Sequence, residues 1–178
     1  MKNILMMPKL IIKLDNNIKL YDAIKKAIEK KSDQALNDIA DYIGTTSDSN
    51  LRDEDGAFDT GFLANSLVVD KEQFLHKEIG YSALYAGYVE FGSSPHFPPI
   101  DAIYSWLWRK KTDLKLTYRK NKNTMLNGKS YNADILGIAW SIAKNMAIKG
   151  TEPKPFMRPA FNEGKSKAGQ IIKKRMSK

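Results

Sequence analysis

An apolar stripe near the N-terminus is the feature that most constrains how this chain can fold. Apolar residues recur there every three or four positions, the spacing that places side chains on one face of a helix. The stripe consists of Leu20, Ala23, Ile24, Ala27, Ile28, Ala35, Leu36, Ile39, Ala40 and Ile43. Charged residues occupy the other faces, so we expect only one face to be buried. The pattern predicts a helix over residues 20–43 that ends at Gly44, since glycine is typical of the position after a helix.

The stretch after Gly44 is polar, acidic and rich in turn residues, which predicts a mobile loop over residues 45–56. Asp53, Glu54 and Asp55 concentrate negative charge in it, and we expect them at an interface with a basic surface of another subunit. A calcium loop built from these residues and Asp48 is the alternative. The spacing of an EF-hand is absent, which favours a solvated loop.

The rest of the chain alternates short strand patterns with helical ones. Residues 66–69 and 74–81 predict an antiparallel hairpin, and helices are predicted over residues 83–91, 100–111, 135–148 and 159–176. In the last helix we expect the apolar residues to be buried, namely Ala160, Phe161, Ala168, Ile171 and Ile172. These patterns predict one α+β domain spanning residues 1–178. In it a small antiparallel sheet, built largely from residues 58–81, packs against the long N-terminal helix and two or three later helices.

The first of three short runs, residues 59–67, holds a tight turn. Thr60 and Gly61 precede Leu63, and glycine tolerates the positive φ that such a turn requires. The third run, residues 155–161, predicts the start of a helix. Pro159 fits a first helical turn, and Phe156 and Phe161 can anchor that helix at its start, with Pro155 and Ala160 as the other members of the motif.

The second run, residues 85–92, contains three aromatic residues and a single charge. Glu90 lies among Tyr85, Tyr88 and Phe91, and Gly92 permits an abrupt exit from a helical turn. A buried carboxylate without a partner is costly. We therefore expect Glu90 to be at least partly buried and bonded to backbone N–H groups or to a basic residue.

Charge divides the chain into two unequal halves. Residues 1–108 carry 11 Lys and Arg against 16 Asp and Glu, whereas residues 109–178 carry 18 against 4, for a net charge of +9. The halves therefore face different partners, or each other. Within the segment of residues 109–133, residues 109–129 carry eight Lys and Arg with one Asp, which predicts either a solvated hairpin or a loop that binds phosphates. Its candidate interface residues are Trp108, Arg109, Lys110, Arg119, Lys120 and Lys122.

Residue patterns typical of enzymes are missing from the sequence. It has no cysteine, no glycine-rich phosphate loop and no helical His-Glu pair. His76 and His96 lack the spacing of a metal site, and Ser94, His96 and Asp101 lie too close in sequence for a catalytic triad. We expect no catalytic site, cofactor or small-molecule substrate. No apolar run reaches the roughly 18 residues of a membrane span, which predicts a soluble, unprocessed chain.

In their order and spacing, the three runs resemble the neck or tail-completion family of long-tailed bacteriophages, the gene-ten-like minor structural proteins of the HK-ninety-seven type. A long amphipathic helix precedes the first run and a basic helix follows the last, as in that family. The resemblance covers roughly residues 20–108 and 135–172. The stretch between, which contains the basic insertion, departs from the family.

This resemblance implies a structural virion protein and not an enzyme. It implies a ring of identical subunits, six-fold, at the head–tail junction, assembled in the host cytoplasm. The implied partners are other copies of the chain, the head-side connector and the tail tube or tail terminator proteins, with genomic DNA passing through the lumen. The alternative is a basic nucleic-acid-binding protein that contacts phosphates through residues 109–129.

Overall fold

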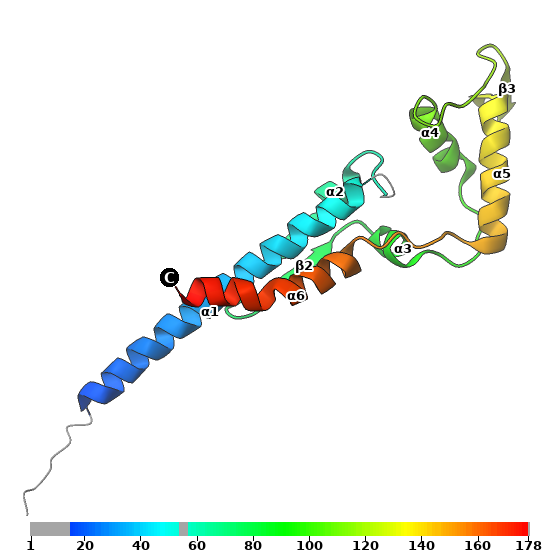
Figure 1. The fold of residues 1–178 in the computed structure, drawn as a ribbon. Coiled ribbons are helices and arrows are strands. Elements are labelled where there is room, and N and C mark those ends of the chain that lie inside the picture. The colour runs from blue at the N-terminus through cyan, green and yellow to red at the C-terminus, as the bar shows by residue number, and fades with distance from the viewer. Residues whose placement is uncertain (1–14, 54–56, 178) are drawn as a thin grey trace, which may run out of the picture.

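The structure, a computed structural model, describes residues 15–53 and 57–177, with side chains from residue 18 onward. Its elements are α1 (Asp15–Arg52), α2 (Phe62–Asn65), β1 (Leu67–Asp70), β2 (Glu78–Tyr81), α3 (Ala86–Phe91), α4 (Ile100–Lys110), β3 (Asn123–Leu126), β4 (Lys129–Asn132), α5 (Ala133–Lys149) and α6 (Met157–Met176). The fold is α+β, as predicted, with two small antiparallel sheets. Figure 1 shows α1, α6 and the first hairpin at one end, and α4, α5 and the second hairpin at the other.

Helix α1 is longer than predicted and runs on past Gly44 to Arg52. The predicted loop is therefore wrong for residues 45–52. Ser47 and Leu51 continue the row of residues that faces the core, and both are buried. Gly44 lies within the helix, where Leu67 and Val69 of β1 pack over it; a Cβ added there would meet them at ordinary contact distances of 3.4 and 3.6 Å. Tertiary packing thus overrides the usual meaning of a glycine at this position.

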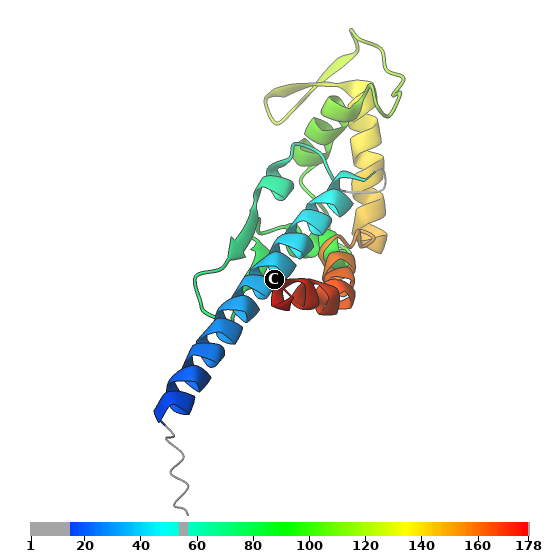
Figure 2. The same cartoon turned by 60° about the vertical axis from the view of Figure 1, so that its left-hand side comes forward.

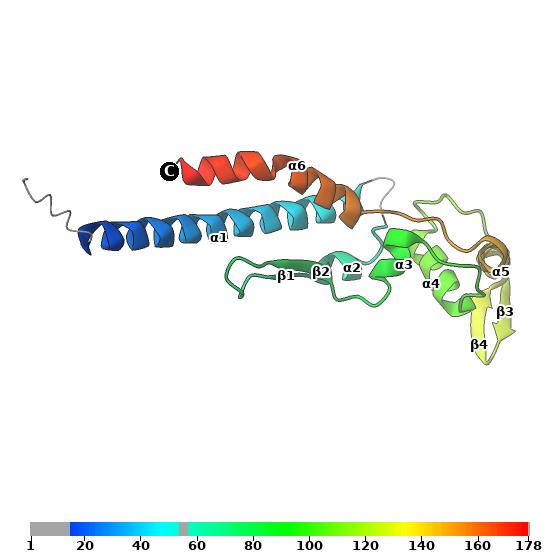
Figure 3. The same ribbon diagram turned by 90° about the horizontal axis from the view of Figure 1, so that it is seen from below.

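Helix α6 runs antiparallel to α1 and covers its second half, as Figure 3 shows. The two helices approach closely at Gly164, where an added Cβ would lie 2.3 Å from Ile43 Cγ1. At the far end of the pair, Arg175 Nε donates to Asp38 at 2.5 Å. Ala160 is buried as predicted.

The predicted burial of Phe161 and Ile172 is wrong, because both side chains are exposed. Successive residues of a helix are 100° apart, and the row that faces α1 runs through Ala160 and Gly164. Phe161 and Ile172 lie on the flank of that row. Helix α6 has only α1 to cover it there, so the flank stays open.

The first hairpin pairs β1 with β2 in a register that sets Leu67 opposite Tyr81 and Asp70 opposite Glu78. Leu67 and Val69 point toward α1. The second strand was predicted to begin at residue 74. It begins at Glu78, because residues 71–77 form a long connecting loop. The hairpin itself is confirmed.

The second lobe is built on α4 and α5, whose buried residues Ile103, Leu107, Ile135, Ala139 and Ala143 form a core of their own. The segment inserted between them contains a basic stretch of turns and loop, residues 111–122, followed by the β3–β4 hairpin, whose strands hold one basic residue, Lys129. The turn of this hairpin is Asn127–Gly128, both with positive φ, the dipeptide typical of two-residue hairpin turns. The sequence predicted either a solvated hairpin or a phosphate-binding loop for this segment. The structure shows a hairpin over residues 123–132.

In the view turned by 60°, the second lobe lies behind the end of α1 (Figure 2).

None of the helices within residues 15–53 and 57–177 has the length and apolar character needed to cross a membrane.

Candidate functional site

Glu90 joins the second and third sequence runs. It lies on α3, and its side chain is only 6% exposed. One carboxylate oxygen accepts the backbone N–H groups of Phe156 and Met157 at 2.8 and 2.9 Å, and the other accepts that of Arg158 at 3.0 Å. Arg158 Nε donates a further bond at 2.9 Å. The predicted burial and partners of Glu90 are confirmed.

These bonds make Glu90 the cap of α6. The first N–H groups of a helix have no partner within it. In α6 the N-cap residue, Phe156, makes no side-chain bond to them, and the first turn contains no acidic residue. The positive end of the helix dipole also favours a negative charge there. Burial alone would raise the pKa of Glu90, but the three backbone N–H groups and the Arg158 guanidinium outweigh it and hold that pKa below its ordinary value.

Two connecting segments cross between the lobes beside this cap. Ser93 and Thr151 form an isolated antiparallel bridge, with N–H to carbonyl distances of 3.2 and 3.1 Å. Gly92 and Gly150 flank it, both with positive φ, and a Cβ added at Gly92 would lie 2.4 Å from the Thr151 carbonyl oxygen. Gly92 thus ends α3, as predicted, and also allows the second connector to approach.

The first run completes the same junction. Gly61 has a φ of 80° and lies at the start of α2, as predicted for the turn, and Thr60 Oγ1 accepts the N–H of Phe62. Leu63 is buried in a cluster with Leu51, Ala83 and Phe156. All three runs therefore meet around one small core.

Within the third run, Phe156 is the buried anchor. It is 2% exposed, and its ring meets that of Tyr81 edge-on at 4.9 Å between centroids. Ala160 lies on the α1-facing row, while Pro155 and Pro159 are exposed. Helix α6 begins two residues before the predicted Pro159.

The aromatic residues of the second run lie mostly on the surface. Tyr85, Tyr88 and Phe91 are all exposed, and the Arg158 guanidinium lies 4.9 Å from the centre of the Phe91 ring. Tyr85, Tyr88, Val89 and Met146 line an open, largely apolar groove of about 780 Å³ between α3 and the Thr151 connector. The junction therefore offers an aromatic surface to a partner.

Most charged residues of the basic segment are paired within the chain. Arg119 and Lys122 both reach Asp134, at 3.0 and 3.2 Å, and these contacts hold the pKa of Asp134 far below its ordinary range. Lys110 pairs with Asp113, and Arg109 pairs with Asp59 in the first run. Lys120 is exposed, and no polar contact of its side chain with the described residues is seen.

Trp108, a predicted interface residue, is partly exposed, and so is Trp106 on the same helix. The Trp108 ring stacks near Tyr104 and lies under Lys111 Nζ at 4.5 Å. Of the acidic interface residues, Asp53 follows α1 and is exposed, while Glu54 and Asp55 lie outside the described residues.

The sequence patterns did not indicate which groups pair with Glu90, Arg109 and Arg119. These groups are Arg158, Asp59 and Asp134, respectively. The one local signal was Asn132, a residue typical of helix N-caps, whose side chain accepts the N–H groups of Asp134 and Ile135.

His76 Nε2 lies 3.0 Å from a carboxylate oxygen of Glu78, and His96 Nδ1 lies 3.4 Å from Ser93 Oγ. His96 Nδ1 lies 2.9 Å from the Ser94 carbonyl oxygen, and Asp101 accepts bonds from Lys129 and Tyr131. Among the residues that the structure describes, no three His, Cys, Asp or Glu side chains gather where they could hold a metal ion.

The molecule exposes more surface than a compact chain does. A compact monomer of 20.2 kDa exposes about 8,800 Å², whereas this chain exposes 13620 Å². Even if each of the 18 residues outside the described parts exposed as much as an extended chain, about 160 Å², the remaining excess would be about 1,900 Å². Much of this surface is apolar, and large exposed apolar patches mark sites of association.

Comparison with protein-family models, with curated proteins and with solved structures finds no match.

Proposed function

We propose that the chain is a structural virion protein of a long-tailed phage, forming a ring at the head–tail junction that joins or finishes the tail and lets DNA pass. The observation that carries this proposal is the open, elongated surface. Its excess area is apolar at both ends of the molecule, from Tyr21 on α1 to Met125 on β3. A chain built this way gains stability when copies or neighbours cover those surfaces.

The three runs supply the second support. They resemble those of the neck or tail-completion family in order and spacing, and the structure brings them to one junction around Glu90 and Phe156. The resemblance alone supplies the six-fold ring, its place in the virion and its partners, the head-side connector and the tail tube or terminator proteins.

Nucleic-acid binding through the basic segment gains no support from the geometry. Of the basic residues proposed to contact phosphates, namely Arg109, Lys110, Lys111, Arg119, Lys120 and Lys122, four pair with aspartates of the same chain: Arg109, Lys110, Arg119 and Lys122. Phosphate binding would have to compete with these pairs, so we do not propose it as the function.

The test is a head–tail joining assay. Heads and tails are isolated from a phage whose copy of this gene carries a nonsense mutation, purified protein is added, and joined particles are counted by electron microscopy. We expect joining to be restored by the wild-type chain. Joining that occurs equally without the protein, or that the protein does not restore, would contradict the proposal.

A further inference from the structure

The N-terminal turns of α1 project beyond the rest of the fold, as Figures 1 and 3 show. Helix α6 ends beside Lys31, whose Nζ donates to the Met176 carbonyl oxygen at 3.4 Å. Residues 18–30, the projecting segment, carry the first part of the apolar stripe, and none of the helices and strands that the structure describes covers it. Its large apolar residues, Ile18, Leu20, Tyr21, Ile24 and Ile28, are 50–68% exposed.

The projecting segment is also basic. Lys19, Lys25, Lys26 and Lys30 outnumber Asp22 and Glu29, for a net charge of +2. A single helix of this length is marginally stable in water on its own, so it gains from a partner that covers its apolar stripe. The best partner combines apolar side chains with negative charge.

Such a surface lies on the first hairpin and its loop. We define the hairpin surface as Val68, Asp70, Glu72, Phe74, Leu75 and Glu78. The three apolar members are 44–56% exposed, and the three carboxylates are exposed as well. Asp70 and Glu78 are direct cross-strand partners. Like charges opposite each other destabilise a hairpin, so a cation from a partner would be favourable there.

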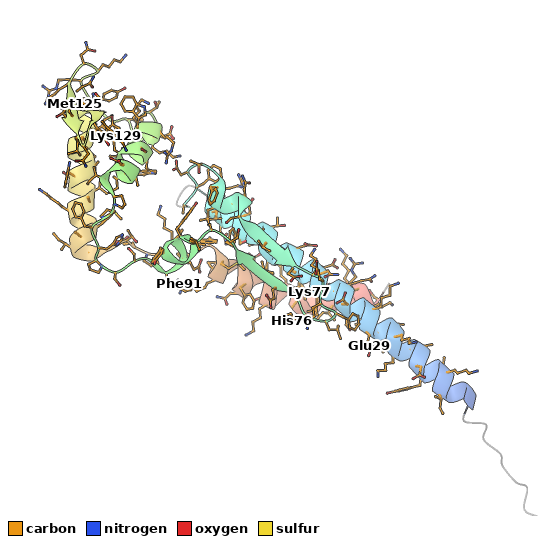
Figure 4. The ribbon with its side chains drawn as sticks, turned by 180° about the vertical axis from the view of Figure 1, so that it is seen from behind. Glu29, His76, Lys77, Phe91, Met125 and Lys129 are labelled. Carbon is orange, nitrogen blue, oxygen red and sulfur yellow. The ribbon has the colours of Figure 1, made fainter. Side chains whose placement is uncertain are left out.

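The loop that presents Phe74 and Leu75 is held rigidly. Asp33 of α1 accepts the N–H of Leu75 and the Nζ of Lys77, both at 2.8 Å. Lys77 Nζ also donates to the carbonyl oxygens of Lys71 and Gln73, and its side chain is only 4% exposed. Figure 4 shows His76 and Lys77 at the end of the hairpin, with Glu29 farther along α1 toward the projecting end.

The backbone of the loop also carries strain. Leu75 has a φ of 57°, a conformation that is uncommon for residues other than glycine and asparagine. Strained residues persist where the surroundings fix them, and they cluster at binding sites. Here the fixed contacts hold two large apolar side chains in solvent.

We infer that the projecting segment of one copy docks on the hairpin surface of a second copy. The apolar stripe covers Val68, Phe74 and Leu75, and the lysines face the three carboxylates. Two projecting segments would repel each other, because both are basic. A contact between two different surfaces is head-to-tail and can close into a ring.

This inference deepens the proposed ring and relies on it for the closure of the contacts. The projecting segment is about 20 Å long, so a single contact covers less than the roughly 800 Å² per partner of a stable interface. One contact is weak, while a closed ring in which every copy gives and receives one is much stronger.

The absence of cysteine in the sequence allows a direct test by cross-linking. Ile24→Cys and Phe74→Cys variants, one of them carrying a mass tag, are mixed at millimolar concentration and oxidised. We expect a disulfide between the two variants in preference to dimers of either. The matched control pairs Ile24→Cys with Met125→Cys, which is similarly exposed on the other lobe. Circular dichroism checks that each variant is folded.

Charge exchange tests the complementarity. Lys25→Glu with Lys26→Glu in the donor should lower the cross-link yield several-fold, and Glu72→Lys with Glu78→Lys in the acceptor should restore it. A yield no higher than the Met125 control, a predominance of Ile24–Ile24 dimers, or insensitivity to charge would each overturn the inference. The cross-link needs no phage particle, so its failure alongside normal head–tail joining would leave the proposed function standing.

Discussion

At the level of single residues, the N-terminus of α6 depends on a carboxylate that comes from α3. Glu90 accepts three backbone N–H groups that the helix itself cannot satisfy. We expect Glu90→Gln to lower the free energy of unfolding by about 3 kcal/mol at pH 7, because a neutral amide cannot accept all these bonds and Arg158 loses its partner. Urea denaturation measures the change, with exposed Glu152→Gln as the control.

The same carboxylate gives a pH dependence of known sign. The pKa of Glu90 is lower in the folded chain than its ordinary 4.5. Its contribution is therefore complete above pH 4.5 and is lost as the pH falls through the folded value. The difference in stability between wild type and Glu90→Gln should shrink below pH 4.5. A constant difference down to pH 3 would contradict the assignment of Glu90 as a charged cap.

Two phenylalanines of the third run give a matched pair for core packing. Phe156 is 2% exposed and Phe161 is 55% exposed. Phe156→Ala should cost about 3–5 kcal/mol, as expected for a fully buried ring, and Phe161→Ala less than about 0.5 kcal/mol in the isolated chain. Thermal denaturation distinguishes them, and equal melting temperatures would show that Phe156 is not an anchor.

The sequence predicted the burial of Glu90 correctly and that of Phe161 wrongly, because it reports on local surroundings and not on which elements pack together. A lone charge in an aromatic run needs partners wherever it lies, so its local surroundings suffice. Whether Phe161 is covered depends on which elements pack on α6, and periodicity does not supply that. Arg158, which partners Glu90 from 68 residues away, was likewise beyond local patterns.

At the level of elements, the α1–α6 pair depends on one small residue. An added Cβ at Gly164 would overlap the buried Ile43 side chain, while one at Gly169 on the same helix meets nothing within 4 Å. Gly164→Ala should destabilise the chain by about 1–3 kcal/mol through overpacking. Gly169→Ala should stabilise it by about 0.5–1 kcal/mol through helix propensity. A stabilising effect at both sites would refute the close approach of the helices.

The loop before β3 is fixed to α5 by Asp134, which pairs with Arg119 and Lys122. Arg119→Glu with Lys122→Glu would place two carboxylates beside Asp134, so we expect a lower melting temperature for that variant. Lys120→Glu, on the same exposed segment, should leave it unchanged. Calorimetry of both variants tests whether this basic segment serves the fold before any partner.

Element types were more predictable than element ends. The first hairpin and the five longer helices followed from periodicity and turn residues, whereas the second hairpin was one of two alternatives and α2 was not predicted. The continuation of α1 past Gly44 did not follow from periodicity, because it depends on β1 packing against that glycine. The predicted acidic loop at 45–52 failed for the same reason.

At the level of the whole molecule, the unequal charge of the two halves is partly satisfied within the chain. Arg175 pairs with Asp38, Arg158 with Glu90 and Arg109 with Asp59. Charge asymmetry alone therefore gives weaker support for docking between copies than the sequence implied. The support comes instead from apolar surface that the fold leaves open, together with the local charges of the projecting segment and the hairpin surface.

The most direct test of the central claim is a cryo-EM reconstruction of the head–tail junction in virions of the phage that encodes this chain. We expect a closed ring there, with one α1–α6 pair per subunit and a passage for DNA through its centre. A junction whose density is filled by other proteins, with no ring that fits the α1–α6 pair, would contradict it.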